Sequence, residues 1–130
     1  MNKTGDINAL TRLYDLLLWM IPQLEKLPRG QRFLLGDRIE TLLLDTMELV
    51  IQAVYSKNKT GFLREANLKI EKLRYMIRLI KDLKYISIKK YEFVSRSLND
   101  IGSEIGGWIR FQERSRQGGI PPGESLQNQV

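Results

Sequence analysis

Basic side chains are concentrated between residues 57 and 85 of this chain. The stretch holds nine Lys or Arg residues against three acids, an excess equal to the +6 net charge of all 130 residues. Lysine and arginine side chains neutralise phosphates and release counterions when they meet a polyanion. The pattern predicts backbone contact with nucleic acid, and a solvated helix face is the alternative. The residues predicted to make this contact are Arg64, Lys69, Lys72, Arg74, Arg78, Lys81 and Lys84, with Lys89, Lys90 and Arg96 extending the patch.

Catalytic side chains are scarce, because the chain has no Cys and no His. Thiol nucleophiles, imidazole bases and the usual zinc or haem ligands are therefore excluded. Four carboxylates, Asp37, Glu40, Asp45 and Glu48, form two pairs with helical spacing, but the metal centres of ferritin-like bundles also require histidine. We expect no cofactor, no metal and no enzymatic activity. These carboxylates are better explained as partners of the basic stretch, within a subunit or across an interface.

Four stretches with apolar residues three and four apart must position these side chains, and this spacing is typical of helices. The first covers about residues 6–27, with a kink expected at Pro22. The second covers 31–56, the third contains the basic stretch, and the fourth follows Ser87. Short connections between four helices predict an all-α, antiparallel up-down four-helix bundle. The predicted core stripes include Leu13, Leu17, Met20 and Leu24; Ile39, Leu42, Leu49 and Ala53; Leu63, Ala66, Ile70, Leu73, Ile77 and Ile80; and Val94, Leu98, Ile101, Ile105 and Trp108.

A second apolar surface is expected outside this core. Leu68, Tyr75 and Leu79 lie almost opposite the core stripe of the third helix, and the second helix is apolar around much of its circumference. Trp19 lies off the main stripe of the first helix, and tryptophan is enriched in subunit interfaces. These four side chains are the predicted interface of a homo-oligomer. Three glycines near Trp108 further suggest that another backbone approaches the fourth helix closely.

One domain is expected, with the bundle over residues 1–112 and a disordered tail over 113–130, where apolar periodicity ends. The N-terminal apolar run is short and lacks the pattern of a signal peptide. No stretch has the roughly 20 apolar residues that span a bilayer. We therefore expect a cytoplasmic protein without membrane contact.

Several segments, in order, resemble the accessory variability determinant proteins of diversity-generating retroelements. The more specific ones are the Pro-Arg-x-Gln-Arg-Phe motif at 28–33 and Gly-Gly-Trp at 106–108. Together the matching segments extend over about residues 10–111. They are Leu13 to Trp19 with Pro22, Leu24 to Arg29, Gln31 to Phe33, Leu73-Arg74, Arg78-Leu79, Asp82-Leu83, and Ile101-Gly102 with Ile105 to Trp108.

This resemblance implies a four-helix bundle that assembles into a ring-like or barrel homo-oligomer, a pentamer. It implies binding to the reverse transcriptase of the element and to RNA or DNA, in support of error-prone copying of a template RNA into cDNA. It implies no catalytic activity. Arg74 and Arg78 match the family at basic positions and would contact nucleic acid or the polymerase, and Arg29 and Arg32 are further candidates.

Two other interpretations stay open at this point. Proteins encoded in intervening sequences of bacterial large-subunit ribosomal RNA genes are similar in length and helix pattern. A helical scaffold that binds only protein, through an acidic partner of its basic helix, is a third class. The role of the intervening-sequence proteins is undefined. Salt-dependent binding to nucleic acid would separate a nucleic-acid-binding protein from a scaffold that binds only protein.

Overall fold

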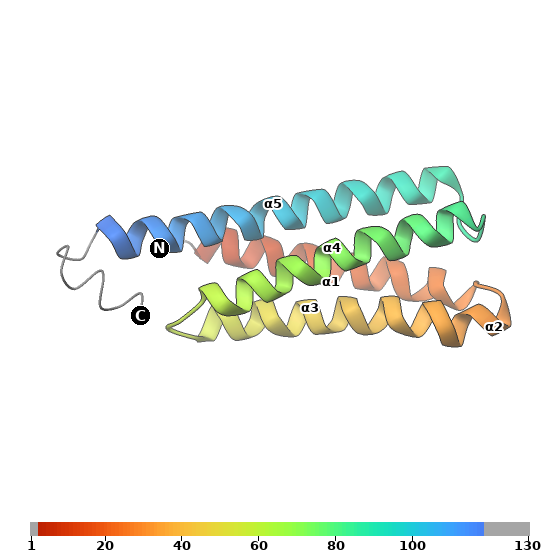
Figure 1. Ribbon diagram of the computed structural model, residues 1–130, viewed down its shortest axis with the longest axis horizontal. Coiled ribbons are helices and arrows are strands. Elements are labelled where there is room, and N and C mark those ends of the chain that lie inside the picture. Colours follow the sequence, from red (N-terminus) through yellow and green to blue (C-terminus); the bar gives the residue numbers. More distant parts are fainter. Residues whose placement is uncertain (1–2, 119–130) are drawn as a thin grey trace.

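The computed structural model describes residues 3–118, with side chains over 8–115 (Figure 1). Four long helices dominate, as the apolar periodicity predicts, and the described residues form no strand. The elements in chain order are α1 (Lys3–Glu25), α2 (Arg29–Gln31), the π-helical turn η1 (Arg32–Gly36), α3 (Asp37–Tyr55), α4 (Thr60–Asp82) and α5 (Ile88–Gly118).

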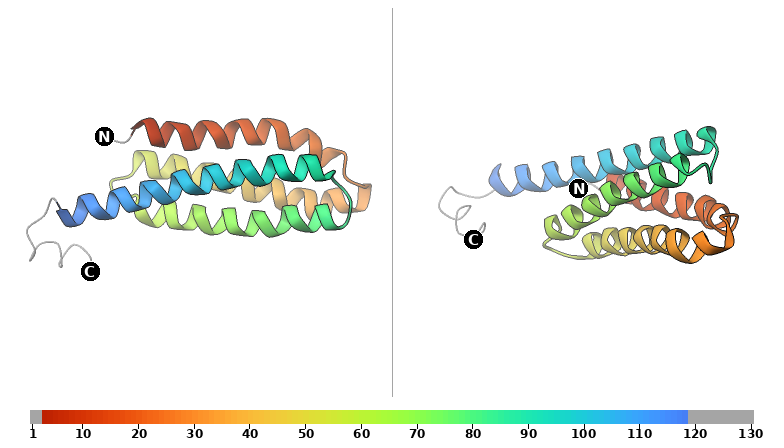
Figure 2. Two further views of the ribbon diagram at one scale, coloured as in Figure 1. Left: turned by 90° about the horizontal axis from the view of Figure 1, so that it is seen from above. Right: turned by 45° about the vertical axis from the view of Figure 1, so that its right-hand side comes forward.

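The long helices lie side by side in the cyclic order α1, α3, α4, α5, and α5 closes the bundle by packing against α1 (Figures 1 and 2). Short connections make neighbours in the chain antiparallel. The α1–α3 and α4–α5 connections therefore lie at one end of the bundle and the α3–α4 connection at the other. The last turns of α5 extend beyond the ends of the other helices. The all-α four-helix bundle is thus confirmed for a single chain, and its assembly into a ring stays a prediction.

The core stripes of α1, α4 and α5 are confirmed. All six predicted residues of α4 are buried, as are five of the six predicted for α5, from Val94 to Trp108. The sixth, Tyr91, is only partly buried. Four predicted residues of α1, from Leu13 to Leu24, are also buried. Because only one narrow face of α4 packs in the core, its basic side chains lie on the outer face and the flanks of the helix.

The first helix contains Pro22 and continues without interruption to Glu25. Proline removes one backbone hydrogen bond from a helix interior and commonly bends it. The kink at this position stays a prediction.

The second predicted helix differs in its first turns. Helical structure begins at Arg29, directly after Pro28, and passes through the π-helical turn before α3 begins. A π turn inserts one extra residue into the helix, so the side chains before the turn are rotated about the helix axis relative to those after it. Gly36 ends this turn near the end of α1, where a Cβ atom would lie 3.8 Å from the Leu24 carbonyl oxygen and 3.5 Å from Leu27 Cδ1.

The core face of α3 is also rotated from the predicted one. Leu43, Thr46 and Val50 are buried in addition to the predicted Ile39, Leu49 and Ala53, whereas Leu42 is only partly buried. The buried Thr46 hydroxyl donates to the Leu42 carbonyl oxygen at 2.6 Å, so its polar atom is satisfied locally.

The disordered tail was predicted to begin at residue 113, which is before the end of α5. Residues 113–118 continue α5, and the remainder of the predicted disordered segment lies outside the described residues. Helical periodicity in the sequence fades after Trp108 because the end of α5 extends past the bundle and has no core to face. None of the described helices is both long enough and apolar enough to cross a membrane.

Candidate nucleic-acid interface

The predicted basic residues of α4 do not form one continuous patch. Arg64, Arg74 and Arg78 lie on the flank facing α5, whereas Lys72 lies beside the groove shared with α3. The outermost line of the helix, between these flanks, carries the exposed Leu68, Tyr75 and Leu79. The cations therefore border an apolar surface on two sides.

Arg74 is the most constrained of these cations. Its guanidinium Nη1 donates to Asn99 Oδ1 of α5, and its Nε lies 2.9 Å from Glu71 Oε2 in an ion pair. Only 34% of the side chain is exposed. Gly102 provides the space for it, because a Cβ atom there would lie 3.1 Å from Arg74 Nη2. The arrangement gives Arg74 a structural role in joining α4 to α5.

This contact also changes the interpretation of the glycines in α5. The sequence suggested a close backbone approach, but the atoms nearest to a Cβ at Gly102 belong to the side chains of Arg74, Ile70 and Asn67. A Cβ at Gly106 would meet Arg110 Nη1 at 3.6 Å, an ordinary contact distance. The expectation of a tight helix–helix backbone contact was wrong.

Three other predicted cations form ion pairs with exposed carboxylates, and Lys81 is itself only 27% exposed. Arg64 pairs with Glu113 near the end of α5, and Arg78 and Lys81 both approach Asp82, at 3.8 and 2.8 Å. The hydrogen bond from Lys81, helped by the charges of Lys81 and Arg78, lowers the pKa of Asp82 below its ordinary value. Exposed pairs of this kind contribute about 0 to 1 kcal/mol, so a phosphate can compete with the carboxylate for the cation.

The remaining predicted cations have no acidic partner within the described part of the chain. They are Lys69, Lys72, Lys84, Lys89, Lys90 and Arg96. Lys90 is occupied in another way, since its Nζ donates to Gln23 Oε1 of α1 at 2.7 Å. Lys72, Lys84, Lys89 and Arg96 are exposed. Lys84 lies in the α4–α5 connection and Lys89 in the first turn of α5, and no acid lies between them in the sequence.

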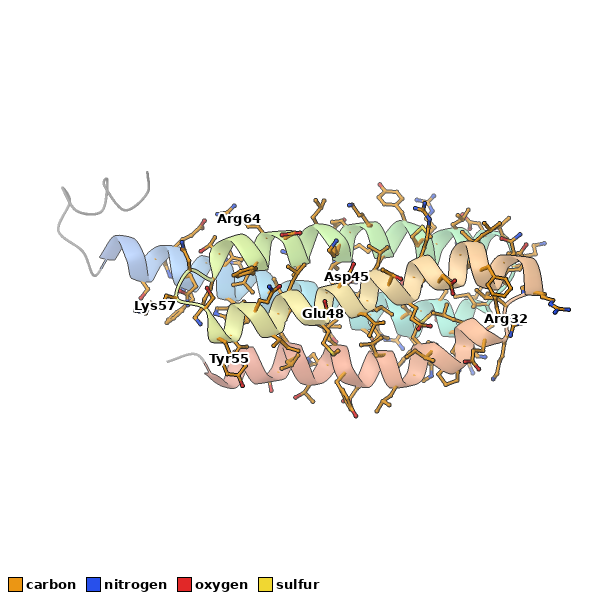
Figure 3. All side chains as sticks on the ribbon, turned by 90° about the horizontal axis from the view of Figure 1, so that it is seen from below. Arg32, Asp45, Glu48, Tyr55, Lys57 and Arg64 are labelled. Atoms are coloured by element: carbon orange, nitrogen blue, oxygen red, sulfur yellow. The ribbon has the colours of Figure 1, made fainter. Side chains whose placement is uncertain are left out.

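The carboxylates of α3 are not neutralised by the basic helix. None of Asp37, Glu40, Asp45 and Glu48 forms an ion pair with any described residue, so pairing with α4 inside one subunit is not observed. Among residues whose side chains are described, no three acidic side chains are arranged to hold a metal ion. Figure 3 shows Asp45 and Glu48 on α3, which lies between α4 and α1 in this view.

Trp19, predicted for an interface, is engaged within its own chain. It is partly buried, and its ring centroid lies 4.7 Å from that of Phe93 on α5, with the rings tilted by 51°. The ring thereby helps to hold α1 against α5. Its predicted part in an interface between subunits is not tested by this contact.

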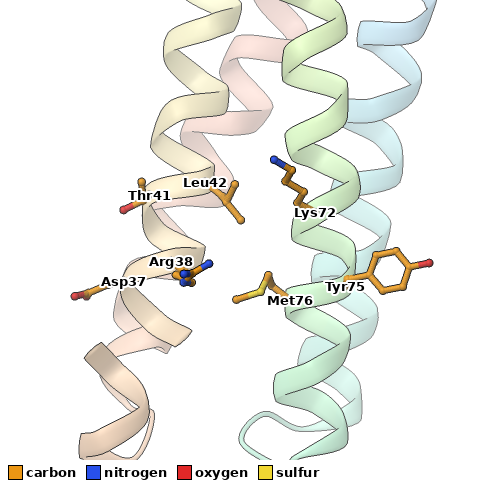
Figure 4. Close-up of a pocket in the computed structure, with 7 residues that line it drawn as sticks. All are labelled: Asp37, Arg38, Thr41, Leu42, Lys72, Tyr75 and Met76. Atoms are coloured by element: carbon orange, nitrogen blue, oxygen red, sulfur yellow. The ribbon is translucent and has the colours of Figure 1, made fainter. Parts of the chain in front are cut away.

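Two features of the surface were not anticipated from the sequence. One is an open, mostly apolar groove of about 600 Å³ between α3 and α4 (Figure 4). The position of the groove depends on how α3 is rotated about its axis. A regular helical period does not predict this rotation, because the π-helical turn precedes α3. The other is Lys59, whose Nζ donates to three carbonyl oxygens at the end of α3 at 2.8 to 3.1 Å. The groove is lined by Asp37, Arg38, Thr41, Leu42, Lys72, Tyr75 and Met76.

The fold and the surface together define a class of protein: a four-helix bundle with a basic helix. A family model of bAvd-like proteins matches residues 9–112, which is most of the chain. The protein therefore belongs to the bAvd-like family, and its resemblance to accessory variability determinant proteins is confirmed. Neither the comparison with curated proteins nor the comparison with solved structures finds a match.

Proposed function

We propose that this protein is a non-catalytic accessory factor of a diversity-generating retroelement, acting in the cytoplasm. It binds the reverse transcriptase of the element together with template RNA or the cDNA, and so supports mutagenic reverse transcription. The observation that carries this proposal is the family match over residues 9–112. The basic surface of α4 and α5 is consistent with a polyanion as one of the partners.

The nucleic-acid contact is proposed for the cations without acidic partners, chiefly Lys72, Lys84, Lys89 and Arg96. Arg64, Arg78 and Lys81 contribute by exchanging their exposed carboxylate partners for phosphate. Arg74 supports this surface indirectly by fixing α4 against α5. Because lysine and arginine dominate and no recognition motif is present, binding is to the backbone and independent of sequence.

Salt dependence tests this assignment. Lys84→Gln with Arg96→Gln should weaken binding to RNA and reduce the slope of log K against log salt by roughly 1 to 2, because each lost phosphate contact removes released counterions. The matched control is Lys57→Gln with Arg114→Gln, which changes the net charge equally. Lys57 lies in the α3–α4 connection and Arg114 near the end of α5, at the far end of the bundle from Lys84. Equal effects of both variants would show only a general charge effect.

A scaffold that binds only protein is the second candidate. The observation that favours it is the ion pairing of four predicted contact residues, which lowers the charge available to a polyanion. No measurable RNA or DNA affinity at low salt, alongside stable association with the reverse transcriptase, would select this function.

Self-association is part of the proposal. A homo-oligomer, expected to be a pentamer, would cover the exposed Leu68, Tyr75 and Leu79, and Trp19 is the fourth candidate for the interface. Three large apolar side chains on the outer line of one helix support this view. Sedimentation at micromolar concentration tests it, and a single species of 15.2 kDa would contradict it.

A further inference from the structure

The connection between α4 and α5 is fixed by packing and by the caps of both helices. Tyr85 and Ile86 are partly buried and pack against the core. The Tyr85 amide donates to the Ile80 carbonyl oxygen at 2.8 Å, which closes the end of α4. At the start of α5, the Ser87 hydroxyl accepts from the Lys90 amide at 3.2 Å. The remaining side chains of the connection are therefore presented to solvent from a well-defined backbone.

The side chains that point to solvent here are apolar and basic. Leu83 follows α4 and is 46% exposed, and Ile88 begins α5 and is 67% exposed. Each is followed in the sequence by an exposed lysine, Lys84 or Lys89, and neither lysine has an ion-pair partner among residues 8–115. We call residues 83–89 the α4–α5 corner. It lies at one end of the bundle (Figure 1).

The charge of the α4–α5 corner favours a partner with closely spaced anions. Lys84 and Lys89 are its only charged residues. The nearest acids along the chain are Asp82, which is already paired with cations of α4, and Glu92, which follows one turn into α5. A single strand of nucleic acid offers both phosphates and the apolar faces of unpaired bases, whereas a duplex keeps its base faces stacked. The corner therefore suits a single strand better than a duplex.

We propose that the α4–α5 corner binds unpaired bases, with Ile88 against the face of a base and Lys84 and Lys89 at the neighbouring phosphates. The inference rests on the proposed nucleic-acid contact and names its substrate class, a strand with unpaired bases. Isoleucine and leucine are among the side chains that proteins insert between bases. Leu83 flanks the same site, but it follows Leu79 of the proposed self-association surface by one helical turn. Ile88, on α5, is therefore the residue that separates the two functions.

Ile88→Gln tests the base contact without changing the net charge. The probes are an oligouridylate and a long RNA duplex, compared at one salt concentration because phosphate contacts depend on salt. Affinity for the oligouridylate should fall roughly tenfold, as for the loss of one stacked base. Affinity for the duplex should change less than about twofold, because its phosphate contacts remain. The control is Leu18→Gln on α1, which removes an apolar side chain of similar exposure, 61%, and should bind both probes as the native chain does.

A second variant, Ile88→Trp, reports the base contact directly. An indole ring has a larger stacking surface than the isoleucine side chain, so affinity for the oligouridylate should rise. Fluorescence of the introduced indole should be quenched when the oligouridylate saturates the protein. Trp19 is partly buried and Trp108 is buried, and the native chain measured in parallel supplies their background signal. Circular dichroism must show native helix content, and sedimentation the native mass, for every variant.

Several outcomes would overturn the inference. A native chain without measurable affinity for either RNA removes the proposed nucleic-acid contact together with the base contact. If Lys84→Gln with Arg96→Gln weakens binding and Ile88→Gln does not, the phosphate contact stands and the base contact is wrong. Equal losses of Ile88→Gln on both probes, or no quenching in Ile88→Trp, would also contradict the base contact. If Ile88→Gln loses only binding to phosphatidylglycerol vesicles, the corner belongs to an anionic lipid surface instead.

Discussion

At the scale of single residues, Lys84 ends α4 in a conformation that usually belongs to glycine. Its φ is 67°, the one positive value among the non-glycine residues that the structure describes. The Lys84 amide donates to the Lys81 carbonyl and the Tyr85 amide to the Ile80 carbonyl, at 2.9 and 2.8 Å. These two bonds form the Schellman motif, which requires a left-handed residue at this position.

Replacing this lysine by glycine should therefore stabilise the protein. We expect Lys84→Gly to raise the free energy of unfolding by about 1 kcal/mol, because the left-handed conformation costs a side chain about that much. Urea denaturation measures the change. Leu83→Gly is the control, since Leu83 has a φ of −76° and should lose stability on the same change. A loss of stability in Lys84→Gly would show that the lysine side chain matters more than the backbone.

The glycines of α5 allow a second residue-scale prediction. Gly106→Ala should raise the free energy of unfolding by up to about 1 kcal/mol, because alanine favours the helix and the new Cβ meets nothing closer than 3.6 Å. Gly102→Ala should gain less or lose, since its Cβ would press on Arg74 Nη2 at 3.1 Å. Thermal unfolding of the two variants side by side checks the order. A larger gain at Gly102 would mean that Arg74 moves freely.

At the scale of helices, Lys59 connects the end of α3 to the start of α4. Its ammonium donates to the carbonyl oxygens of Ala53, Val54 and Ser56, at the end of a helix where carbonyl groups lack intrahelical donors. The Ala53 oxygen also accepts from the Ser56 amide at 3.4 Å. It also lies 6.0 Å from the centre of the Trp108 ring on α5. One side chain thus holds three helices together at this end of the bundle.

Lys59→Met should lower the free energy of unfolding by about 2 kcal/mol, because it leaves these carbonyl oxygens without their charged donor. The control is Lys57→Met, an exposed neighbour, for which a change of less than about 0.5 kcal/mol is expected. Denaturation in guanidinium chloride measures both. Equal stability of the two variants would mean that water replaces the ammonium without cost.

The helices themselves were the most predictable part of this protein. A regular spacing of apolar residues located the buried faces of α1, α4 and α5, because each helix has one neighbour-facing stripe. The same rule failed at the start of α3, where the π-helical turn breaks the 3.6-residue period. It also failed for the cations, because sequence spacing within α4 carries no information on the acids and amides of α5 that pair with Arg64 and Arg74.

At the scale of the whole molecule, charge is divided between two sides of the bundle. Acids prevail on α3 and bases on α4, and the exposed apolar side chains lie on both. The proposed self-association would use the exposed apolar side chains, and the proposed polyanion contact would use the cations of α4 and α5. The accessory role proposed for this member of the bAvd-like family combines the two kinds of surface in one assembly.

The most direct test of this role is co-expression with the reverse transcriptase encoded at the same locus, followed by affinity purification at moderate salt and mass measurement of the complex. We predict co-purification at a fixed ratio, with several copies of this chain per polymerase. We also predict that Lys84→Gln with Arg96→Gln lowers the RNA content of the complex. A folded, active polymerase that purifies without this protein would contradict the central claim.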